Sequence, residues 1–357
     1  MSTRISSLMG SVLQAALTPH PVDRYLELVD PMMTWRDLRA EIIGVRRSTE
    51  RTVTLTLRPT RQWKGHKAGQ YVQLSTVIDG VRHMRCFSPA NAAGDRHDDI
   101  ELTITAHDDG FVSRHLRETA HPGMVVGLDQ AAGDFTLPEN PGRNVVFISG
   151  GSGITPVLSM LRTLVASNYR GSMTFVHYAR SADDVAYHAE LQNLAALNPN
   201  LDLRLHYTRG ASPDHFTAAH LADVDTADAD IFLCGPASLM DAVREHCEGA
   251  GLADRLHTEA FTLTVPAVDP NQPITGTVSF TESKVTAEND GRTILDQAES
   301  AGLSPESGCR MGICFSCTKV KKSGCTRNVL TGELDTEADQ HIQLCVNTPV
   351  GDVEIEV

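Results

Sequence analysis

The sequence predicts a multidomain chain of three units: an antiparallel β-barrel over residues 40–140, an α/β unit with a parallel sheet over 141–264, and a small α+β unit over 274–357. Three observations lead to this prediction. Apolar residues first alternate with polar ones, then occur in short apolar runs between helical stretches, and alternate again after a proline-rich segment. Alternation is typical of half-buried strands, whereas apolar runs between helices are typical of a parallel sheet. A length of 357 residues also exceeds what one domain usually holds.

The composition and charge of the chain exclude some kinds of partner. Hydrophobic residues make up 41% and charged residues 21%, as in soluble globular proteins, and no apolar run reaches the roughly 18 residues that a membrane span needs. The net charge of −14 argues against nucleic acid as a partner. Eight cysteines in a chain of this length are not a secreted disulfide framework. We therefore expect a cytoplasmic protein without a transmembrane segment of its own.

Residues 1–39 carry helical patterning that Pro19, Pro21 and Pro31 divide into short pieces. We predict a helical N-terminal arm that packs on the next unit. Nothing in this arm indicates chemistry.

Residues 40–140 consist of short alternating segments separated by turn residues. The predicted strands include 52–57, 71–74, 82–87 and 100–105. Strands of this length and spacing are typical of an antiparallel barrel.

Residues 141–264 alternate between apolar runs and helical patterns. Strands are predicted at 145–148, 173–178, 201–207 and 231–233, and helices at 157–166, 185–196 and 238–248. This alternation implies a parallel sheet, because a crossover helix is what allows successive strands to run in the same direction.

Residues 265–273 hold three prolines in nine positions, which predicts a semi-rigid linker to the third unit. The elements predicted beyond it are a strand at 277–280, a helix at 293–301 and a closing strand at 353–357. Residues 276–357 contain 13 acidic and 7 basic side chains, a net charge of −6. A protein partner of this unit should therefore present a basic patch.

Four cysteines of the third unit have the spacing of a metal centre. Cys309, Cys314 and Cys317 follow the pattern C-x4-C-x2-C, and Cys345 comes after 27 further residues. This is the plant-type spacing of a [2Fe–2S] cluster, in which one tight loop aims three sulfurs inward. Gly308 and Gly312 suit such a loop, because backbone N–H groups can approach the sulfurs where no Cβ intervenes. The alternatives are a disulfide pair or a zinc site, but zinc sites usually use paired C-x2-C knuckles.

A glycine-rich turn joins an apolar strand to a helix in the second unit. Its sequence is Gly150-Gly151-Ser152-Gly153-Ile154-Thr155-Pro156. Glycines at such a junction let backbone N–H groups reach a pyrophosphate, and the helix dipole favours its negative charge. Proline in the first turn costs little, because its missing N–H would have been unpaired. The alternative is a tight strand–helix connection with no ligand.

Two further motifs stand on either side of this turn. Arg85-Cys86-Phe87-Ser88 lies upstream and Cys234-Gly235-Pro236 lies downstream. In this order, the three motifs resemble the ferredoxin–NADP reductase family. In that family R-x-Y-S binds flavin, G-G-T/S-G-x-x-P binds the pyrophosphate of the nicotinamide cofactor, and C-G-P lies by the nicotinamide. With the cysteine unit at its C-terminus, the chain resembles the three-domain reductases of oxygenases and desaturases.

The resemblance covers about residues 40–357 and implies FAD in the barrel, NAD(P)H in the α/β unit and a β-grasp ferredoxin fold for the third unit. The N-terminal arm and residues 79–83 look most like the NADPH-dependent reductase partners of actinobacterial stearoyl-CoA desaturases. The reductase of phenylacetyl-CoA epoxidase is a more distant likeness.

For the flavin, the resemblance implies roles for two segments. Arg85 would pair with the pyrophosphate, Phe87 would stack on the flavin, and Ser88 would hydrogen-bond near its reactive nitrogen, with Cys86 between them. Gly110, Val112 and Ser113 would form a second phosphate contact. The chain departs from the family at Phe87, where the usual tyrosine would add a hydroxyl contact, and at the turn of residues 130–133.

For the nicotinamide cofactor, the resemblance implies pyrophosphate contacts at Gly150, Gly151, Ser152, Gly153, Thr155 and Pro156. Cys234, Gly235 and Pro236 would lie by the nicotinamide, with Cys234 packing and orienting rather than acting as a nucleophile. Phe261 would lie over the flavin, the alternative being plain core packing. Ser88, Cys234 and Phe261 are thus expected beside the reacting atoms.

Two arginines favour NADPH over NADH. An NAD site usually has a carboxylate for the ribose hydroxyl, whereas arginine accommodates the 2′-phosphate of NADP. Arg180 ends one predicted strand, and Thr208-Arg209 ends the next. Asp183 and Asp184 are close enough in sequence to be mere salt-bridge partners of Arg180.

The function predicted is a relay of electrons from NADPH through FAD and the [2Fe–2S] cluster to a separate acceptor. By resemblance the acceptor is a diiron fatty-acyl desaturase or hydroxylase bound to the membrane, which would make the chain peripheral to the membrane through its partner. The alternative acceptor is a soluble oxygenase acting on aromatic or acyl-CoA substrates. A hypothesis of another class is a non-catalytic redox sensor, against which the flavin motif at Arg85 and Ser88 argues.

Overall fold

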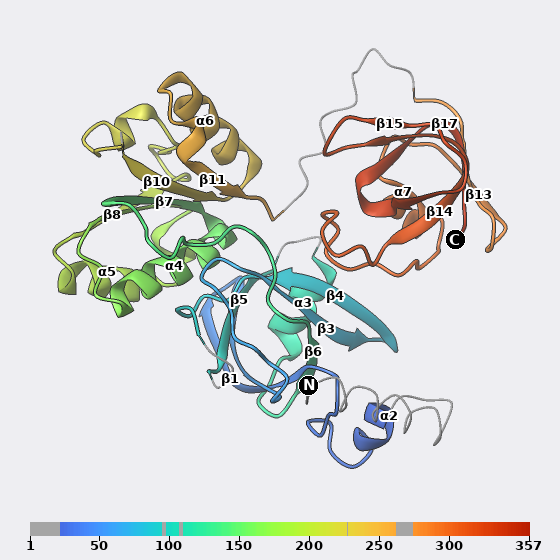
Figure 1. Ribbon diagram of the computed structural model, residues 1–357, viewed down its shortest axis with the longest axis horizontal. Coiled ribbons are helices and arrows are strands. Elements are labelled where there is room, and N and C mark those ends of the chain that lie inside the picture. Colours follow the sequence, from blue (N-terminus) through green and yellow to red (C-terminus); the bar gives the residue numbers. More distant parts are fainter. Residues whose placement is uncertain (1–21, 95–97, 107–109, 227, 262–273) are drawn as a thin grey trace, which may run out of the picture.

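The computed structural model describes residues 22–94, 98–106, 110–226, 228–261 and 274–357, and Figure 1 shows three units. The linker predicted at 265–273 and most of the N-terminal arm lie outside the described residues. The described part of the arm holds α2 (Val22–Leu26). The buried carboxylate of Asp23 accepts hydrogen bonds from the backbone N–H groups of Trp35 and Arg36, which fixes the arm ahead of the first strand.

The first unit is a six-stranded antiparallel sheet, and its class was predicted correctly. Its elements are β1 (Arg39–Thr49), β2 (Thr52–Pro59), β3 (Val72–Ile78), β4 (Val81–Phe87), β5 (Ile100–Thr105), α3 (Phe111–Thr119) and β6 (Val125–Leu128). The strand order is β4-β3-β6-β1-β2-β5. Inward side chains such as Ile42, Leu55 and Leu102 are completely buried and form one core with Leu116 of α3. β1, β6 and α3 were not predicted.

The second unit is a five-stranded sheet in which every strand pair is parallel, as predicted. Its elements are β7 (Asn144–Gly150), α4 (Ile154–Ala166), β8 (Ser172–Ala179), α5 (His188–Leu197), β9 (Leu201–Tyr207), β10 (Ala229–Cys234), α6 (Ala237–Gly249) and β11 (Leu256–Glu259). β11 was not predicted, because four residues that are all at least partly exposed give no apolar run. The predicted helix 185–196 begins later, at His188, after a short 3-10 turn.

The strand order of this sheet is β11-β10-β7-β8-β9. The chain first moves outward from β7 to β9 and then returns to the other side of β7 with β10. Ligands of open parallel sheets bind outside the carboxyl ends of the strands at such a switch point. The two strand ends at this point are Gly150 of β7 and Cys234 of β10, so the topology places the glycine turn and the C-G-P motif together.

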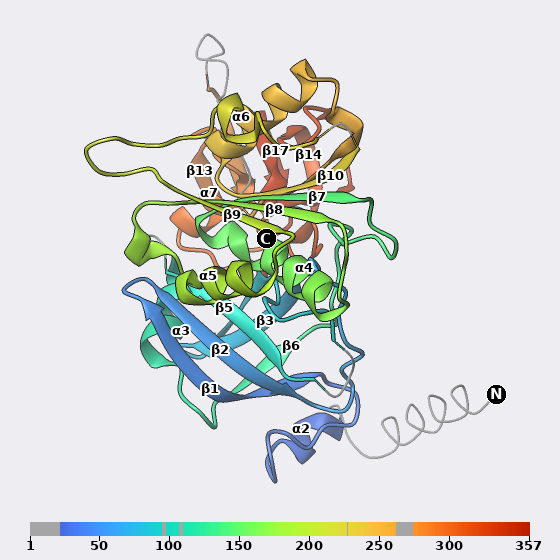
Figure 2. The same cartoon turned by 90° about the vertical axis from the view of Figure 1, so that its left-hand side faces the viewer.

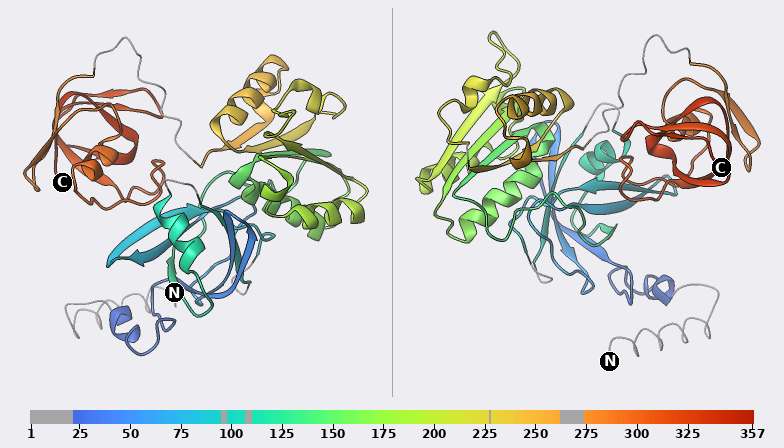
Figure 3. Two further views of the ribbon diagram at one scale, coloured as in Figure 1. Left: turned by 180° about the vertical axis from the view of Figure 1, so that it is seen from behind. Right: turned by 45° about the horizontal axis from the view of Figure 1, so that its top comes forward.

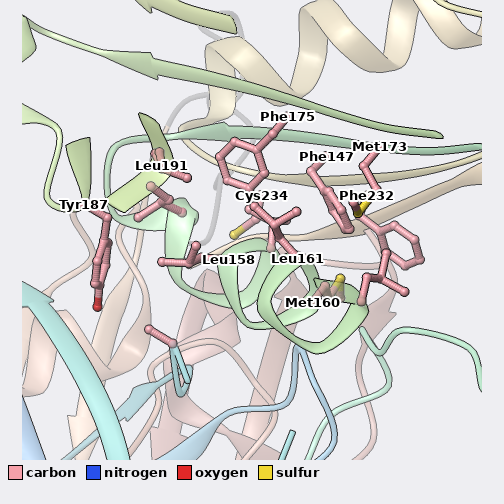
Figure 4. Close-up of a cluster of buried hydrophobic side chains, with 14 of the residues drawn as sticks. Phe147, Leu158, Met160, Leu161, Met173, Phe175, Tyr187, Leu191, Phe232 and Cys234 are labelled. Atoms are coloured by element: carbon pink, nitrogen blue, oxygen red, sulfur yellow. The ribbon is translucent and has the colours of Figure 1, made fainter. Parts of the chain in front are cut away.

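α4 and α5 lie between the parallel sheet and the barrel, as the two views of Figures 1 and 2 show. Figure 4 shows Leu158 and Leu161 of α4 beneath the rings of Phe147 and Phe175, in the core cluster that these residues share. On the barrel side, Arg162 forms ion pairs with Glu101 and Glu190 at 2.7 Å each. The pair with Glu101 of β5 links the second unit to the barrel, whereas Glu190 belongs to α5 of the same unit as Arg162.

The third unit is a mixed sheet with one helix packed on it. Its elements are β12 (Thr277–Phe280), β13 (Val285–Glu288), α7 (Ile294–Ser300), β14 (Thr318–Asn328), β15 (Leu334–Asp335), β16 (Gln340–Gln343) and β17 (Asn347–Ile355). β12 and β17 are parallel, and the other pairs are antiparallel. This agrees with the predicted α+β class, although the closing strand starts six residues before position 353.

The longest strand of the third unit, β14, was not predicted, because its pattern contains a buried charge. Lys321 is completely buried, and its ammonium lies 3.0 Å from the carboxylate of Asp335 on β15. Lysine usually lies at the surface, so a buried lysine interrupts the sequence pattern of apolar and polar residues that would indicate a strand. The views of Figures 1 and 3 agree that this unit (orange to red) lies beside the other two.

Candidate cofactor-binding site

A cavity of about 1090 Å³ lies where the three units meet. Its walls come from the end of β4, the start of α3, the turn between β7 and α4, the ends of β8 and β10, and the cysteine loop of the third unit. Ligand cavities are commonly about 300–1,000 Å³, so this one is large enough for more than one small group. The cavity also joins all three sequence motifs in one space.

Most of the predicted site residues line this cavity. They are Arg85, Cys86, Phe87, Ser88, Gly110, Val112, Ser113, Gly150, Gly151, Ser152, Gly153, Thr155, Arg180, Thr208, Gly235, Pro236, Phe261 and Cys309. The predicted residues that do not line it are Pro156, Arg209, Cys234, Cys314, Cys317 and Cys345. Pro156 and Cys234 are buried behind the wall, and Arg209 is exposed outside it.

Three helices begin at the cavity, and none of them has a side-chain cap from the residues that the structure describes. α3 starts after Gly110, α4 after Gly153 and α6 after Pro236, and none of these three N-cap residues accepts a side-chain hydrogen bond from its helix. The first N–H groups of a helix lack partners inside the helix and carry partial positive charge. Three uncapped N-termini around one space favour anions such as the phosphates of dinucleotides.

The glycine turn packs directly against the end of β10. A Cβ on Gly153 would lie 2.2 Å from the carbonyl oxygen of Cys234, and a Cβ on Gly150 would lie 2.8 Å from Cδ of Pro236. Side chains at these positions would push the turn away from the strand. Cys234 is completely buried, which raises the pKa of its thiol well above the ordinary value. The thiol therefore stays protonated and supports the wall rather than facing the cavity.

The flavin motif presents an unsatisfied hydroxyl and a desolvated cation. The Ser88 hydroxyl is buried with no hydrogen-bond partner among the described residues, although Ser88 lines the cavity. Such an orphaned group fits a ligand that supplies the missing bond. The Nη1 of Arg85 donates to the carbonyls of Met84 at 2.7 Å and Gly308 at 3.4 Å.

Burial, together with the nearby charge of Arg310, lowers the pKa of Arg85. No ion pair involving Arg85 occurs in the described part of the chain, and the nearby carboxylate of Glu299, which pairs with Arg310, offsets its desolvation only in part. An anionic ligand would supply that compensation. The residues present thus fit a flavin nucleotide with its pyrophosphate near Arg85.

The two arginines that were predicted to bind the 2′-phosphate of NADPH, Arg180 and Arg209, lie in different positions relative to the cavity. Arg180 is exposed, lines the cavity and forms no ion pair within the residues that the structure describes. The carboxylate of Asp184 instead accepts a hydrogen bond from Ser181 at 2.7 Å. The salt-bridge alternative for Arg180 is therefore not realised. Arg209 donates its backbone N–H to the carbonyl of Arg180 at 3.0 Å but lies outside the cavity.

The cysteine loop has the geometry of a thiolate cage. The N–H of Cys309 donates to Sγ of Cys314 at 3.1 Å, and the N–H groups of Met311 and Ile313 donate to Sγ of Cys309 at 3.3 and 3.4 Å. The thiols of Cys317 and Cys345 hydrogen-bond each other, which lowers the pKa of Cys317 and raises that of Cys345.

The structure shows why glycine occurs at the two predicted positions of this loop. A Cβ on Gly308 would lie 2.7 Å from Sγ of Cys314, and Gly312 has a φ of +78°. None of the eight cysteines, all of which are described, forms a disulfide. Two pairs of neighbouring sulfurs, Cys309 with Cys314 and Cys317 with Cys345, and backbone N–H groups directed at the first pair fit a [2Fe–2S] cluster.

The sequence analysis did not identify Glu259 as a functional residue. Its Cα pairs with that of Cys234 across β11 and β10, and its Oε2 is buried with no partner among the described residues. Burial raises the pKa of Glu259 from 4.5 to about 8. A strongly perturbed carboxyl beside a cleft is typical of functional sites. Its position two residues before the predicted Phe261 was the available signal, but burial of the glutamate cannot be read from the sequence.

We expect Glu259→Gln to stabilise the protein at alkaline pH. The pKa of Glu259 is higher in the folded protein than in the unfolded chain. The folded protein is therefore most stable below the unfolded pKa, and its free energy of unfolding falls as pH rises toward the folded pKa. The advantage of the variant should therefore grow between about pH 4.5 and pH 8, reaching a few kcal/mol at most. Thermal unfolding midpoints across this range measure it. The exposed Glu245→Gln is the control, and an advantage of Glu259→Gln that does not change with pH would contradict the expectation.

Several other cavity residues carry no motif in the sequence. Tyr178, His215 and Phe216 line it near the end of β8, and Arg310 and Met311 line it from the cysteine loop. Single aromatic or histidine residues in a loop give no sequence signal of function. Only the tertiary structure brings them to the site.

Three family models match the chain in the order of its units. An "Oxidoreductase FAD-binding domain" matches residues 43–137, an "Oxidoreductase NAD-binding domain" matches 147–245, and a "2Fe-2S iron-sulfur cluster binding domain" matches 278–349. The matches cover the barrel, the parallel sheet and the cysteine unit respectively. Among the described residues, no helix has the length and apolar character needed to cross a membrane.

Relatives match over most of the chain. An NADPH oxidoreductase of Mycobacterium tuberculosis is 35% identical over 348 residues, covering 95% of this chain and 90% of the relative. A glycine betaine monooxygenase reductase subunit of Pseudomonas aeruginosa is 31% identical and covers 81% of this chain and 87% of the relative. The solved phthalate dioxygenase reductase has the same fold, with a TM-score of 0.64, 22% identity, and coverage of 89% of this chain and 97% of that one. From the domain matches and the relatives together, the chain belongs to the ferredoxin–NADP reductase family, as an FAD-, NAD(P)H- and [2Fe–2S]-dependent electron-transfer reductase.

Proposed function

We propose that this reductase carries electrons from NADPH, through FAD and the [2Fe–2S] cluster, to a diiron fatty-acyl desaturase or hydroxylase. The observation that carries the proposal is the shared cavity, which is lined by the flavin motif at Arg85–Ser88, the glycine turn at 150–153 and the first cluster cysteine, Cys309. Bound FAD would take up two electrons together and release them singly to the cluster. The protein's part is to hold the three groups close together in fixed orientations.

On the flavin side, each residue binds or orients. Arg85 pairs with the pyrophosphate, and the uncapped start of α3 at Gly110 and Ser113 gives a second phosphate contact. Phe87 packs on the flavin ring. The buried Ser88 hydroxyl, which has no partner among the described residues, would hydrogen-bond near the reactive ring nitrogen.

On the nucleotide side, the turn at Gly150 and Gly153 presents N–H groups to the pyrophosphate of NADPH. Arg180 at the cavity wall pairs with the 2′-phosphate, with Thr208 beside it. Cys234 supports the turn from behind, and Phe261 at the cavity wall would lie over the flavin. No side chain has to act as a nucleophile or a general base in this scheme.

The identity of the acceptor rests on two kinds of likeness. Residues 79–83 and the N-terminal arm resemble reductases of membrane-bound desaturases, which favours an acyl desaturase or hydroxylase. A second candidate is favoured by the relatives that are named as reductase subunits of glycine betaine monooxygenase and stachydrine N-demethylase. On that ground the acceptor would be a soluble oxygenase.

An anaerobic titration of the purified holoprotein with NADPH, and separately with NADH, tests the relay. We expect the flavin and cluster bands of the visible spectrum to bleach at low NADPH, with NADH needing a much higher concentration. A bleached flavin beside a cluster that stays oxidised would contradict the relay. A protein that reduces neither dye nor cytochrome c with NADPH would instead support the sensor hypothesis.

Reconstitution of the reductase with each candidate acceptor tests which protein receives the electrons. Purified reductase is mixed with a membrane-bound acyl desaturase and, in parallel, with a soluble oxygenase component, and NADPH-dependent product formation is measured. Product formed only with the soluble component would favour the second candidate.

A further inference from the structure

Two histidines and an aspartate gather near the end of β9 in the nucleotide unit. Nδ1 of His206 lies 2.6 Å from Oδ2 of Asp214, and Nε2 of His220 lies 3.1 Å from Oδ1 of the same carboxylate. One ligand atom from each of the three residues lies within 4.8 Å of the other two. The two imidazole rings stack with their centroids 4.0 Å apart. Two imidazoles thus share one carboxylate, and the proposed relay gives this group no role.

The donor atoms of this group are those that zinc prefers. Two imidazole nitrogens and a carboxylate oxygen suit a borderline-soft divalent cation better than Mg²⁺ or Ca²⁺, which take oxygen ligands. Zinc lies about 2.0–2.2 Å from such atoms, so the ligand atoms of a tetrahedral site are about 3.3 Å apart. The separations of 2.6 and 3.1 Å are slightly shorter than this. A small opening of the hydrogen-bonded group would therefore admit the ion, with water as the fourth ligand.

Tyr178 at the end of β8 orients both imidazoles. Its hydroxyl lies 2.7 Å from Nδ1 of His220, which is the ring nitrogen that does not face Asp214. Metal-binding histidines usually have such a partner on the second nitrogen, because it fixes the tautomer and the ring orientation. With Nδ1–H donating to the hydroxyl, Nε2 of His220 keeps a lone pair for a metal ion. Tyr178 also stacks on the ring of His206, with centroids 5.0 Å apart.

The backbone around the group is fixed, and the group is open to solvent on one side. His206 lies on β9, and the N–H of Asp214 donates to the carbonyl of Tyr207 at 2.9 Å. The carbonyl of His220 accepts a hydrogen bond from Nη1 of Arg204, another residue of β9, at 2.6 Å. The two histidine side chains are 15% and 14% exposed, whereas the aspartate side chain is 48% exposed. An ion therefore has an entry path along the carboxylate.

The segment between Asp214 and His220 forms part of the cavity wall. His215 and Phe216, which follow Asp214 directly, line the cavity. An ion held by both ends of this segment and by His206 would attach the segment to the parallel sheet. A wall that is fixed before the cofactor arrives lowers the ordering cost of binding.

We propose that His206, Asp214 and His220 form a zinc-binding site that fixes the nucleotide wall of the cavity. The site is separate from the four cluster cysteines. It carries no electrons, because Zn²⁺ has no redox chemistry. Its existence does not depend on the proposed relay, whereas its effect on the affinity for NADPH rests on the proposed function.

Isothermal titration calorimetry of the full-length, tag-free holoprotein with zinc chloride, without NADPH, tests the site. We expect one ion to bind per chain. Tyr178→Phe, which removes only the hydroxyl beside His220, should weaken zinc binding about 10- to 100-fold, the usual cost of losing the partner of a metal-binding histidine. Asp214→Asn and His220→Gln each remove a ligand and should weaken binding further.

His257→Gln is the matched control. His257 lies on β11 of the same unit, its side chain is 47% exposed, and its Nε2 is 4.0 Å from a carboxylate oxygen of Asp230. It therefore tests a single histidine–carboxylate pair, and its loss should leave zinc affinity unchanged. Every protein should keep the flavin and cluster absorption of the wild type in the presence of zinc. That spectrum shows that the variants fold and that zinc has not replaced iron at the cysteines.

Zinc should also lower the KM for NADPH of the wild type, measured by ferricyanide reduction, and EDTA should reverse this effect. The KM of His220→Gln should not respond to zinc. A response that is the same in both proteins would mean that zinc acts on NADPH or at another site, and it would contradict the role in fixing the wall.

Three binding results would overturn the site itself. They are the absence of zinc binding by the wild-type holoprotein, equal zinc affinity of the wild type and His220→Gln, and loss of the cluster absorption as zinc binds. Failure of the relay is a separate observation. In that case the wild-type spectrum does not bleach with NADPH, whatever the calorimetry shows.

Discussion

Replacing Cys345 by alanine is expected to abolish electron transfer to cytochrome c and to leave NADPH-driven reduction of ferricyanide largely intact. Cys345 is the fourth sulfur of the cage and is buried against Cys317. A [2Fe–2S] cluster needs four ligands, so the variant should be purified with flavin but without cluster. We expect a loss of at least about a hundredfold in cytochrome c reduction, since an electron path is removed rather than weakened. Visible and EPR spectra and the two rates provide the measurement.

Cys325→Ala is the matched control for this experiment. Cys325 lies in the same unit, on β14, is partly buried and is not one of the four converging sulfurs. It should keep the cluster and both activities. A Cys345→Ala protein that retains a [2Fe–2S] spectrum would show that another residue completes the cage.

Replacing Arg180 by alanine is expected to raise the KM for NADPH about 10- to 100-fold and to leave the KM for NADH unchanged, because charge-assisted hydrogen bonds contribute about 1.5–3 kcal/mol. Arg180 lines the cavity and forms no ion pair in the described part of the chain, so its charge is available to a phosphate. Arg209→Ala should have a smaller effect, since Arg209 lies outside the cavity wall. Steady-state kinetics with both cofactors measure the difference.

Arg170→Ala serves as the control for a lost positive charge, because Arg170 is exposed on the same unit and does not line the cavity. Its kinetic constants should match the wild type. If Arg180→Ala raised the KM values for NADPH and NADH equally, Arg180 would contact a part that the two cofactors share. The preference for NADPH would then need another origin.

The periodicity of apolar residues carried most of the information about the fold. The classes of all three units were predicted correctly, because each class has its own periodicity of apolar residues. The prediction was weakest where a strand lacks that periodicity. β11 is short and partly exposed, and β14 contains the buried Lys321.

The sequence alone indicated which residues to expect at the cofactor sites. The spacing of Cys309, Cys314 and Cys317, and the glycines between Gly150 and Gly153, are local requirements of a loop, and local geometry follows from short stretches of residues. The order of the motifs along the chain then indicated the family.

The tertiary structure alone decided how these groups are arranged. It places three helix starts around one cavity, buries Glu259 beside Cys234, and leaves Phe315 exposed on the cysteine loop. Among the described residues it also gives Arg180 no carboxylate partner. Burial, desolvation and the pairing of charges depend on residues that are distant in sequence, and no local pattern encodes them. The cofactor classes were therefore readable from the sequence, whereas the single cavity that the three motifs share depended on the packing of the three units.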